Sequence, residues 1–123
     1  MSSEVCRPAT SEDFEQFYGR PPPPVWMGKA VIRNGKVVGV GSITWDEEGR
    51  ALGAFDHTEP LSRYTMHRTL MGMIRILKTV GEPVLYVARD ESIPGSGRWL
   101  TRAGFSPMPD YPQAWQIKLG VEA

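Results

Sequence analysis

Cysteine, histidine and excess charge of either sign are scarce in this sequence. The single cysteine, Cys6, has no partner for an internal disulfide, so we predict a reducing, cytoplasmic location. The two histidines, His57 and His67, lie far from Cys6 in the chain, and we expect no metal site. Lys plus Arg and Asp plus Glu number 14 each, which gives no electrostatic argument for a nucleic-acid or membrane partner.

Long apolar runs are also missing. No stretch approaches the roughly 18 apolar residues of a membrane-spanning helix, and the polar N-terminus predicts no signal peptide. The 123 residues are enough for one domain with a buried core, which we expect to span residues 1–123. Glycine and proline are plentiful, at 13 and 11 residues, and predict many tight connections.

The first residues predict a strand followed by a capped helix. Val5–Pro8 is expected to be a buried strand that carries Cys6. Thr10 or Ser11 can cap the helix, because either hydroxyl accepts hydrogen bonds from free backbone N–H groups. Gly19 can adopt the left-handed conformation that ends it.

An antiparallel meander is predicted next. The prolines of residues 20–24 require an extended connector. Asn34-Gly35 is the strongest short signal for a two-residue hairpin turn. The meander strands are expected at residues 25–33, 36–45 and 50–56.

The second half alternates predicted helices and strands. A long helix is expected over 62–80, with Gly81 behind it, and the apolar run Pro83–Arg89 is typical of a strand buried on both faces. The stretch SGRWLTRAGFSP predicts a second helix that Gly104 closes. Ala114–Leu119 is the last expected strand. This order predicts a mixed α/β sheet with helices on its faces.

Two motifs give this element order a family resemblance. CRPATSEDF and SGRWLTRAGFSP resemble the opening and the late helix of the GNAT superfamily of N-acetyltransferases. The resemblance implies a mixed sheet with an antiparallel meander, helices on both faces and a V-shaped splay between the central strands. Those central strands would be Arg50–Asp56 and Pro83–Arg89. The implied activity is transfer of an acetyl group from acyl-coenzyme A to an amine, which is a small molecule or a protein.

Among relatives, the run Arg98, Trp99, Leu100 resembles small GNAT-like proteins of short-tailed bacteriophages, some of which are internal virion proteins. This finer likeness implies an alternative function, a noncatalytic virion or host-interaction component that works through a protein partner or as a homo-oligomer. The location would then be the host cytoplasm or the virion.

The implied cofactor is acetyl-CoA, but the expected phosphate-binding turn departs from the family. Thr65 and His67 occupy the positions of its two glycines, so side chains would have to replace backbone N–H groups as phosphate ligands. The alternative is an ordinary capped, solvated helix start. The predicted cofactor-binding residues are Phe55, Ser62, Arg63, Tyr64, Thr65, His67, Arg68 and Ser96.

The catalytic groups depart from the family as well. Leu100 stands where many relatives have the tyrosine that protonates the leaving thiolate, so Tyr86, Tyr111 or a water would have to substitute. The segment GRPPPPV is too short for the helix that usually walls the acceptor site, which implies an open or partner-completed acceptor face. The candidates for taking the proton from the amine are Asp56, His57 and Glu59, with ordinary turn chemistry as the alternative.

Overall fold

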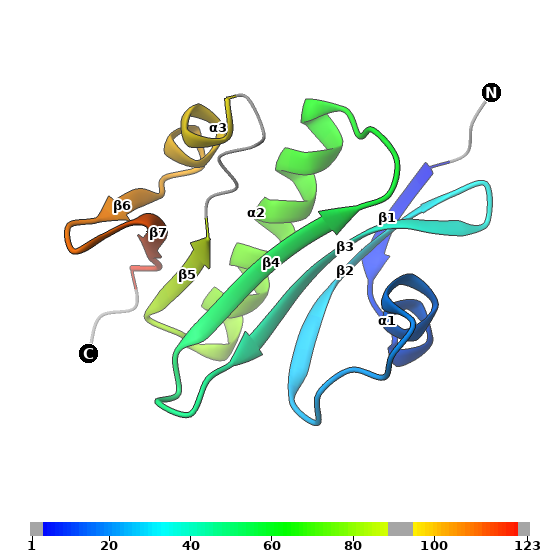
Figure 1. The fold of residues 1–123 in the computed structure, drawn as a ribbon, viewed down its shortest axis with the longest axis horizontal. Helices are drawn as coiled ribbons and strands as arrows, with labels where there is room; N and C mark the ends of the chain where they lie inside the picture. The colour runs from blue at the N-terminus through cyan, green and yellow to red at the C-terminus, as the bar shows by residue number, and fades with distance from the viewer. Residues whose placement is uncertain (1–3, 89–94, 121–123) are drawn as a thin grey trace.

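A computed structural model describes residues 4–88 and 95–120, which form one mixed sheet and three helices (Figure 1). The strands run along the sheet in the order β1-β2-β3-β4-β5-β7-β6. The elements are β1 (Glu4–Pro8), α1 (Ser11–Tyr18), β2 (Trp26–Arg33), β3 (Lys36–Trp45), β4 (Ala51–His57), α2 (Arg63–Val80), β5 (Val84–Ala88), α3 (Ser96–Arg102), β6 (Ser106–Met108) and β7 (Tyr111–Lys118).

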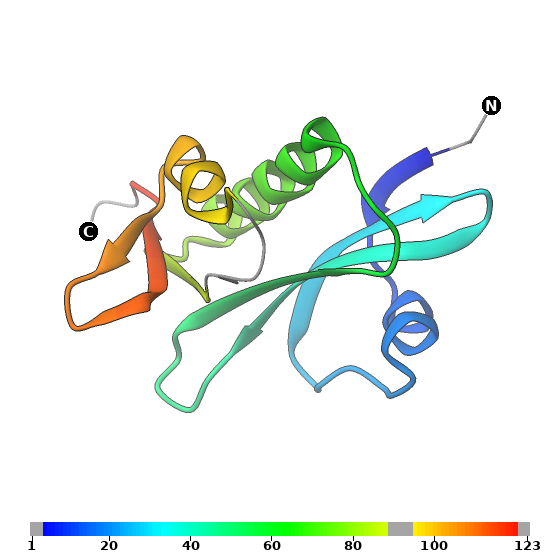
Figure 2. The ribbon, with the colours of Figure 1, turned by 45° about the horizontal axis from the view of Figure 1, so that its top comes forward.

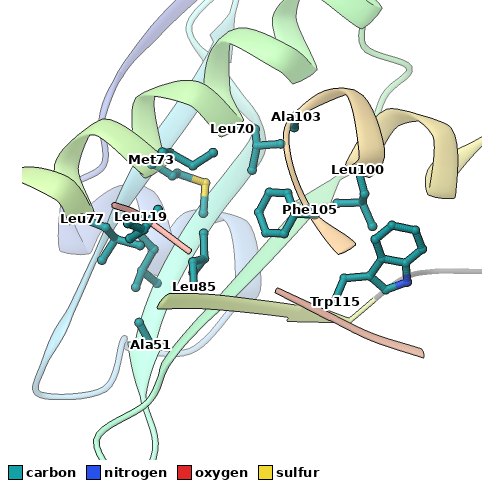
Figure 3. Packing of buried hydrophobic residues seen from close by; sticks show 12 residues of the cluster. Ala51, Leu70, Met73, Leu77, Leu85, Leu100, Ala103, Phe105, Trp115 and Leu119 are labelled. Atoms are coloured by element: carbon teal, nitrogen blue, oxygen red, sulfur yellow. The ribbon is translucent and has the colours of Figure 1, made fainter. Parts of the chain in front are cut away.

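Helices cover both faces of the sheet, as the sequence predicts. α1 lies on one face, where Phe17 and Tyr18 pack against Ala30 and Val40. α2 and α3 lie together on the other face (Figure 2). Side chains from both of these helices join the sheet in the main core, including Met73 of α2 (Figure 3).

Local turn and cap signals are confirmed. Asn34 and Gly35 both have positive φ, 52° and 81°, which a two-residue hairpin turn matched to the twist of β2 and β3 requires. Thr10 caps α1 in a reciprocal arrangement with Asp13. Gly19, with φ of 73°, ends the helix.

The abrupt end of α3 follows from Gly104. Its φ of 101° disfavours any residue with a side chain. Its N–H donates to the Thr101 carbonyl at 3.0 Å, and the Phe105 N–H donates to the Leu100 carbonyl at 2.9 Å. Phe105 thereby folds back into the core (Figure 3). Gly81 ends α2 in the same left-handed conformation.

Four expectations from the sequence need correction. The short strand β6 was not expected, because only three residues pair and a register shift interrupts them. β7 begins at Tyr111, three residues before the predicted 114.

β1 is an edge strand, so Cys6 is half-buried rather than buried. β5 is not buried on both faces: Leu85 is its one fully buried residue, and the predicted end of this strand at Arg89 lies outside the described residues.

No helix in the described part of the chain is both long and apolar enough to cross a membrane.

Gly28 lets β2 and β3 pair closely, and its replacement tests this packing. A Cβ at Gly28 would overlap the carbonyl oxygen of Gly41, a backbone atom that cannot move aside. We expect Gly28→Ala to lower the free energy of unfolding by about 1–3 kcal/mol, as overpacking does. Gly72→Ala is the control, because the added methyl meets only the flexible end of Lys29 and improves helix propensity by up to about 1 kcal/mol. Urea denaturation of both variants measures the difference; equal stabilities would contradict the account.

The ion pair between Arg7 and Asp13 predicts a pH-dependent stability. Two guanidinium hydrogen bonds of 2.6 and 3.0 Å from Arg7 hold the pKa of Asp13 below its usual range. A lowered folded-state pKa stabilises the fold above the unfolded pKa of about 3.9 and ceases to do so as pH falls through the folded value. We expect Asp13→Asn to lose roughly 1–3 kcal/mol at pH 7, and less below pH 4.

Chemical denaturation across this pH range measures the effect. Glu15→Gln, an exposed change on the same helix, serves as the control and should stay within about 0.5 kcal/mol. A constant difference between Asp13→Asn and the parent at every pH would overturn the ion-pair explanation.

Candidate functional site

The parallel pairing of β4 with β5 ends early. It covers three residue pairs, from Ala51 with Leu85 to Gly53 with Val87. Among residues 4–88 and 95–120, β4 has no further partner on that side up to His57, while its other edge stays paired with β3 along its whole length. The predicted splay between the two central strands is therefore confirmed.

The backbone of β4 exposes polar groups at this splay. In an antiparallel ladder, alternate residues bond to the same neighbour. Bonds from Thr58 N–H to the Val38 carbonyl and from Asp46 N–H to the Arg50 carbonyl mark the even-numbered residues as those that bond to β3. Phe55 therefore directs its N–H and C=O toward the open side of the splay, and His57 does the same.

A cavity of about 630 Å³ lies where β4 and β5 separate, and α2 and α3 complete its wall. Two strands contribute Gly53, Ala54, Phe55, His57, Val87 and Ala88. Helix α2 contributes Arg63, Met66, His67, Leu70 and Met73. The α3 region contributes Gly95, Ser96, Arg98, Trp99, Leu100 and Arg102.

The charge on this cavity wall is one-sided. Arg63 and His67 of α2 face the cavity together with Arg98 and Arg102 of α3, and all four are exposed. Within residues 4–88 and 95–120, no acidic side chain lines the cavity and none of these four cations forms an ion pair. Arginine guanidinium groups match phosphate geometry with paired donors. The wall can therefore hold a phosphorylated ligand.

Only some of the predicted cofactor residues at the start of α2 line the first cavity. Ser62 caps the helix by accepting from the Thr65 N–H at 3.1 Å, and the Thr65 hydroxyl donates to Glu4 of β1 at 2.5 Å. These two side chains are thus engaged within the fold and lie outside the cavity wall. The wall residues of α2 follow the helical repeat, which carries Tyr64 and Arg68 away from it. Phe55, Arg63, His67 and Ser96 are the four predicted cofactor residues in the wall.

A second cavity, of about 410 Å³, lies on the α1 face of β4. Its wall comprises Phe14, Tyr18, Arg20, Pro21, Pro22, Pro23, Ser42, Thr44, Ala54 and Asp56. Ala54 lines both cavities. The two cavities therefore share a wall residue on β4, directly after Gly53, where the observed pairing with β5 ends.

Three predicted proton acceptors occupy three different places. Asp56 faces the second cavity and accepts a 2.6 Å hydrogen bond from the Tyr18 hydroxyl. Burial and this carboxylate raise the pKa of Tyr18, so the phenol stays a donor. His57 faces the first cavity. Its Nδ1 lies 2.9 Å from the Glu59 carbonyl oxygen, which can only accept, so this hydrogen bond requires a proton on Nδ1.

Glu59 lines neither cavity. Its carboxylate pairs with Arg33 at 3.3 Å and with Lys36 at 3.7 Å. Arg33 also donates to the Pro60 carbonyl at 3.2 Å. These bonds fasten the connection between β4 and α2 to the β2–β3 hairpin, a structural use of the carboxylate.

The position of the expected proton donor is apolar. Leu100 is buried and lines the first cavity, whereas Tyr86 and Tyr111 line neither cavity. The described wall of the first cavity therefore contains no tyrosine.

Sequence reasoning missed several wall residues. One face of α3 carries Arg98, Trp99 and Arg102. Their helical spacing could have predicted that they line the same cavity. Tyr18 and Arg20 carried no comparable signal, because only the packing of α1 on the sheet brings them to β4.

Comparison with known proteins identifies the fold. No family model and no curated protein matches this chain. Solved structures do match along nearly the whole length. The ribosomal-protein-S18-alanine N-acetyltransferase from Escherichia coli is 12% identical, with a TM-score of 0.73 over 98% of this chain and 97% of that one.

Two further structures match as well. A putative acetyltransferase from Salmonella typhimurium, solved with its cofactor acetyl-CoA, is 13% identical, with a TM-score of 0.70 over 98% and 96% of the two chains. An N-acetyltransferase from Staphylococcus aureus Mu50 is 8% identical, with a TM-score of 0.69 over 95% and 98%. This chain therefore has the fold of the GNAT N-acetyltransferases.

Proposed function

We propose that the protein binds acetyl-CoA in the first cavity and transfers the acetyl group to an amine that enters through the second. The observation that carries this proposal is the edge of β4 beyond Gly53, which has no strand partner among the described residues and faces a cavity with cationic side chains on its wall. The fold of the structural neighbours, one of them solved with acetyl-CoA, supports it.

The free edge of β4 suits the pantetheine arm of the cofactor. That arm carries two amide groups, which can pair with a strand as a further strand would. Phe55 and His57 offer the backbone donors and acceptors for such pairing. The apolar wall made by Leu70, Met73 and Leu100 suits its methylene segments.

Side chains would hold the phosphates of the cofactor. The start of α2 has no glycine-rich turn, but Arg63 and His67 stand on the cavity face of this helix. Arg98 and Arg102 of α3 face them across the cavity. Charge-assisted bonds from these groups replace the backbone cradle that a glycine turn would supply.

Asp56 takes the proton from the attacking amine. It lies on the face of the second cavity, two residues from Ala54, which lines both cavities. The amine nitrogen forms a bond to the thioester carbon, the carbon–sulfur bond breaks and the proton passes from nitrogen to the carboxylate. A thiolate is a weak enough base, with a thiol pKa of about 8.5, to leave without a dedicated acid and to take its proton from water.

The noncatalytic alternative, with its resemblance to bacteriophage virion proteins, predicts no cofactor binding. Isothermal titration calorimetry with acetyl-CoA separates the two functions. We expect binding in the micromolar range. Absence of heat at millimolar acetyl-CoA, with the protein folded, would favour the noncatalytic function.

Arginine variants test the cofactor orientation. We expect Arg63→Ala and Arg98→Ala each to weaken acetyl-CoA binding about tenfold, because a charge-assisted hydrogen bond contributes roughly 1.5–3 kcal/mol and 1.4 kcal/mol is a factor of ten. The loss should shrink with added salt. Arg68→Ala is the matched control, since Arg68 lies on α2 outside the cavity wall. Equal affinities for all three variants and the parent would exclude the assigned phosphate site.

Removal of the proton acceptor tests the catalytic step. With the amine that the parent protein acetylates fastest, we expect Asp56→Asn to lower kcat at least about a hundredfold, within the range of general-base catalysis. Its affinity for acetyl-CoA should not change, because Asp56 does not line the first cavity. Thiol release measured with a chromogenic disulfide gives kcat. A parent-like kcat in Asp56→Asn would assign the proton transfer to another group.

A further inference from the structure

The second cavity carries one charge of each sign. Arg20 and Asp56 are the charged residues among its described wall residues. The remaining wall combines aromatic rings and prolines with the hydroxyl groups of Ser42 and Thr44. We propose that this cavity binds a small amino-carboxylic acid as the acceptor, with its amine at Asp56 and its carboxylate at Arg20. This inference rests on the proposed acetyltransfer.

The amine end of the acceptor is fixed by Asp56. Tyr18 donates to Oδ2 at 2.6 Å, which orients the carboxylate and leaves Oδ1 with no bond from another described side chain. That oxygen can accept from an ammonium group. Ala54, on the same face, also lines the first cavity, so an amine bound at Asp56 lies close to the wall residue that the two cavities share.

The carboxylate end is set by Arg20. Its guanidinium carbon lies 5.4 Å from the centre of the Phe14 ring and 5.2 Å from that of Tyr18. Cation–π attraction of this kind holds the guanidinium over the rings. Arg20 forms no ion pair with any acidic side chain in the described ranges. Its edge donors therefore remain available to a carboxylate, which guanidinium binds with two parallel bonds.

The backbone around Arg20 also limits its movement. Gly19 is in the left-handed conformation at the end of α1, and Pro21 restricts the residue before it. The guanidinium thus projects from a short, stiff connector rather than from a long loop. A pre-positioned cation costs less conformational entropy when it binds a carboxylate.

The charge pattern disfavours other amines. A polyamine would place a second cation near Arg20, which repels it. A lysine side chain of a protein brings no carboxylate to the site. The cavity, at about 410 Å³, lies within the range of small-molecule sites. Its aromatic and proline wall suits an apolar side chain on the amino acid.

The test compares carboxylated and decarboxylated acceptors. Thiol release from acetyl-CoA is measured with the twenty L-amino acids, and the best of them is then compared with its own decarboxylated amine. We expect the amino acid to have a kcat/KM at least tenfold higher. In Arg20→Gln, the KM of the amino acid should rise about tenfold while that of the decarboxylated amine stays within twofold, so that the preference is lost.

Controls separate the possible failures. Arg75→Gln, an exposed change on α2 that touches neither cavity, should keep the parent preference. Acetylation of spermidine or of a lysine peptide but of no amino acid, with normal acetyl-CoA binding, would overturn the acceptor assignment and leave the proposed function standing. An equal loss for both acceptors in Arg20→Gln would also overturn it. Absence of acetyl-CoA binding by calorimetry would overturn the acceptor assignment together with the proposed function.

Discussion

The early end of the parallel pairing between β4 and β5 is the constraint on which the rest of the site depends. Strands that stay paired satisfy each other's backbone groups and leave no room between them. Here the last pair is Gly53 with Val87, where a side chain on Gly53 would crowd β5. Beyond it, one edge of β4 has no strand partner among residues 4–88 and 95–120, and a cavity lies between the sheet, α2 and α3. Figure 2 shows these two helices on the same face of the sheet. Ala54, which lines the cavities on both faces, follows directly after the last residue pair.

Each face of the sheet carries a cavity, and the two cavities differ in their charged groups. On the α2 and α3 face, cations that form no ion pair with any described residue line a cavity with an apolar wall, an arrangement suited to a long phosphorylated ligand. On the α1 face, a smaller cavity pairs a fixed carboxylate with a guanidinium stacked on aromatic rings. β4 connects them because its successive side chains alternate between the two faces. One strand thus positions both Asp56 in the second cavity and the backbone groups that face the first.

Much of the fold could be predicted because its signals are local. Asn34-Gly35 requires positive φ at two successive residues, and Gly104 closes a helix whatever surrounds it. The site was less predictable because it depends on contacts between residues distant in the chain. Nothing near Thr65 in the sequence indicates that its hydroxyl donates to Glu4. This hydrogen bond holds the Thr65 side chain outside the cavity wall. In the same way, Arg20 acquires its place only when α1 packs on the sheet. The short strand β6 escaped prediction because three residues, one of them proline, carry no periodic pattern.

The most direct test of this account is amide hydrogen exchange at the open edge of β4, followed by NMR with and without coenzyme A. We expect the N–H groups of Phe55 and His57 to exchange rapidly in the free protein and to become protected when coenzyme A binds. The N–H of Ala54, already directed toward β3, should change little. Saturating coenzyme A that leaves Phe55 and His57 unprotected would contradict the claim that the splayed strand binds the pantetheine arm.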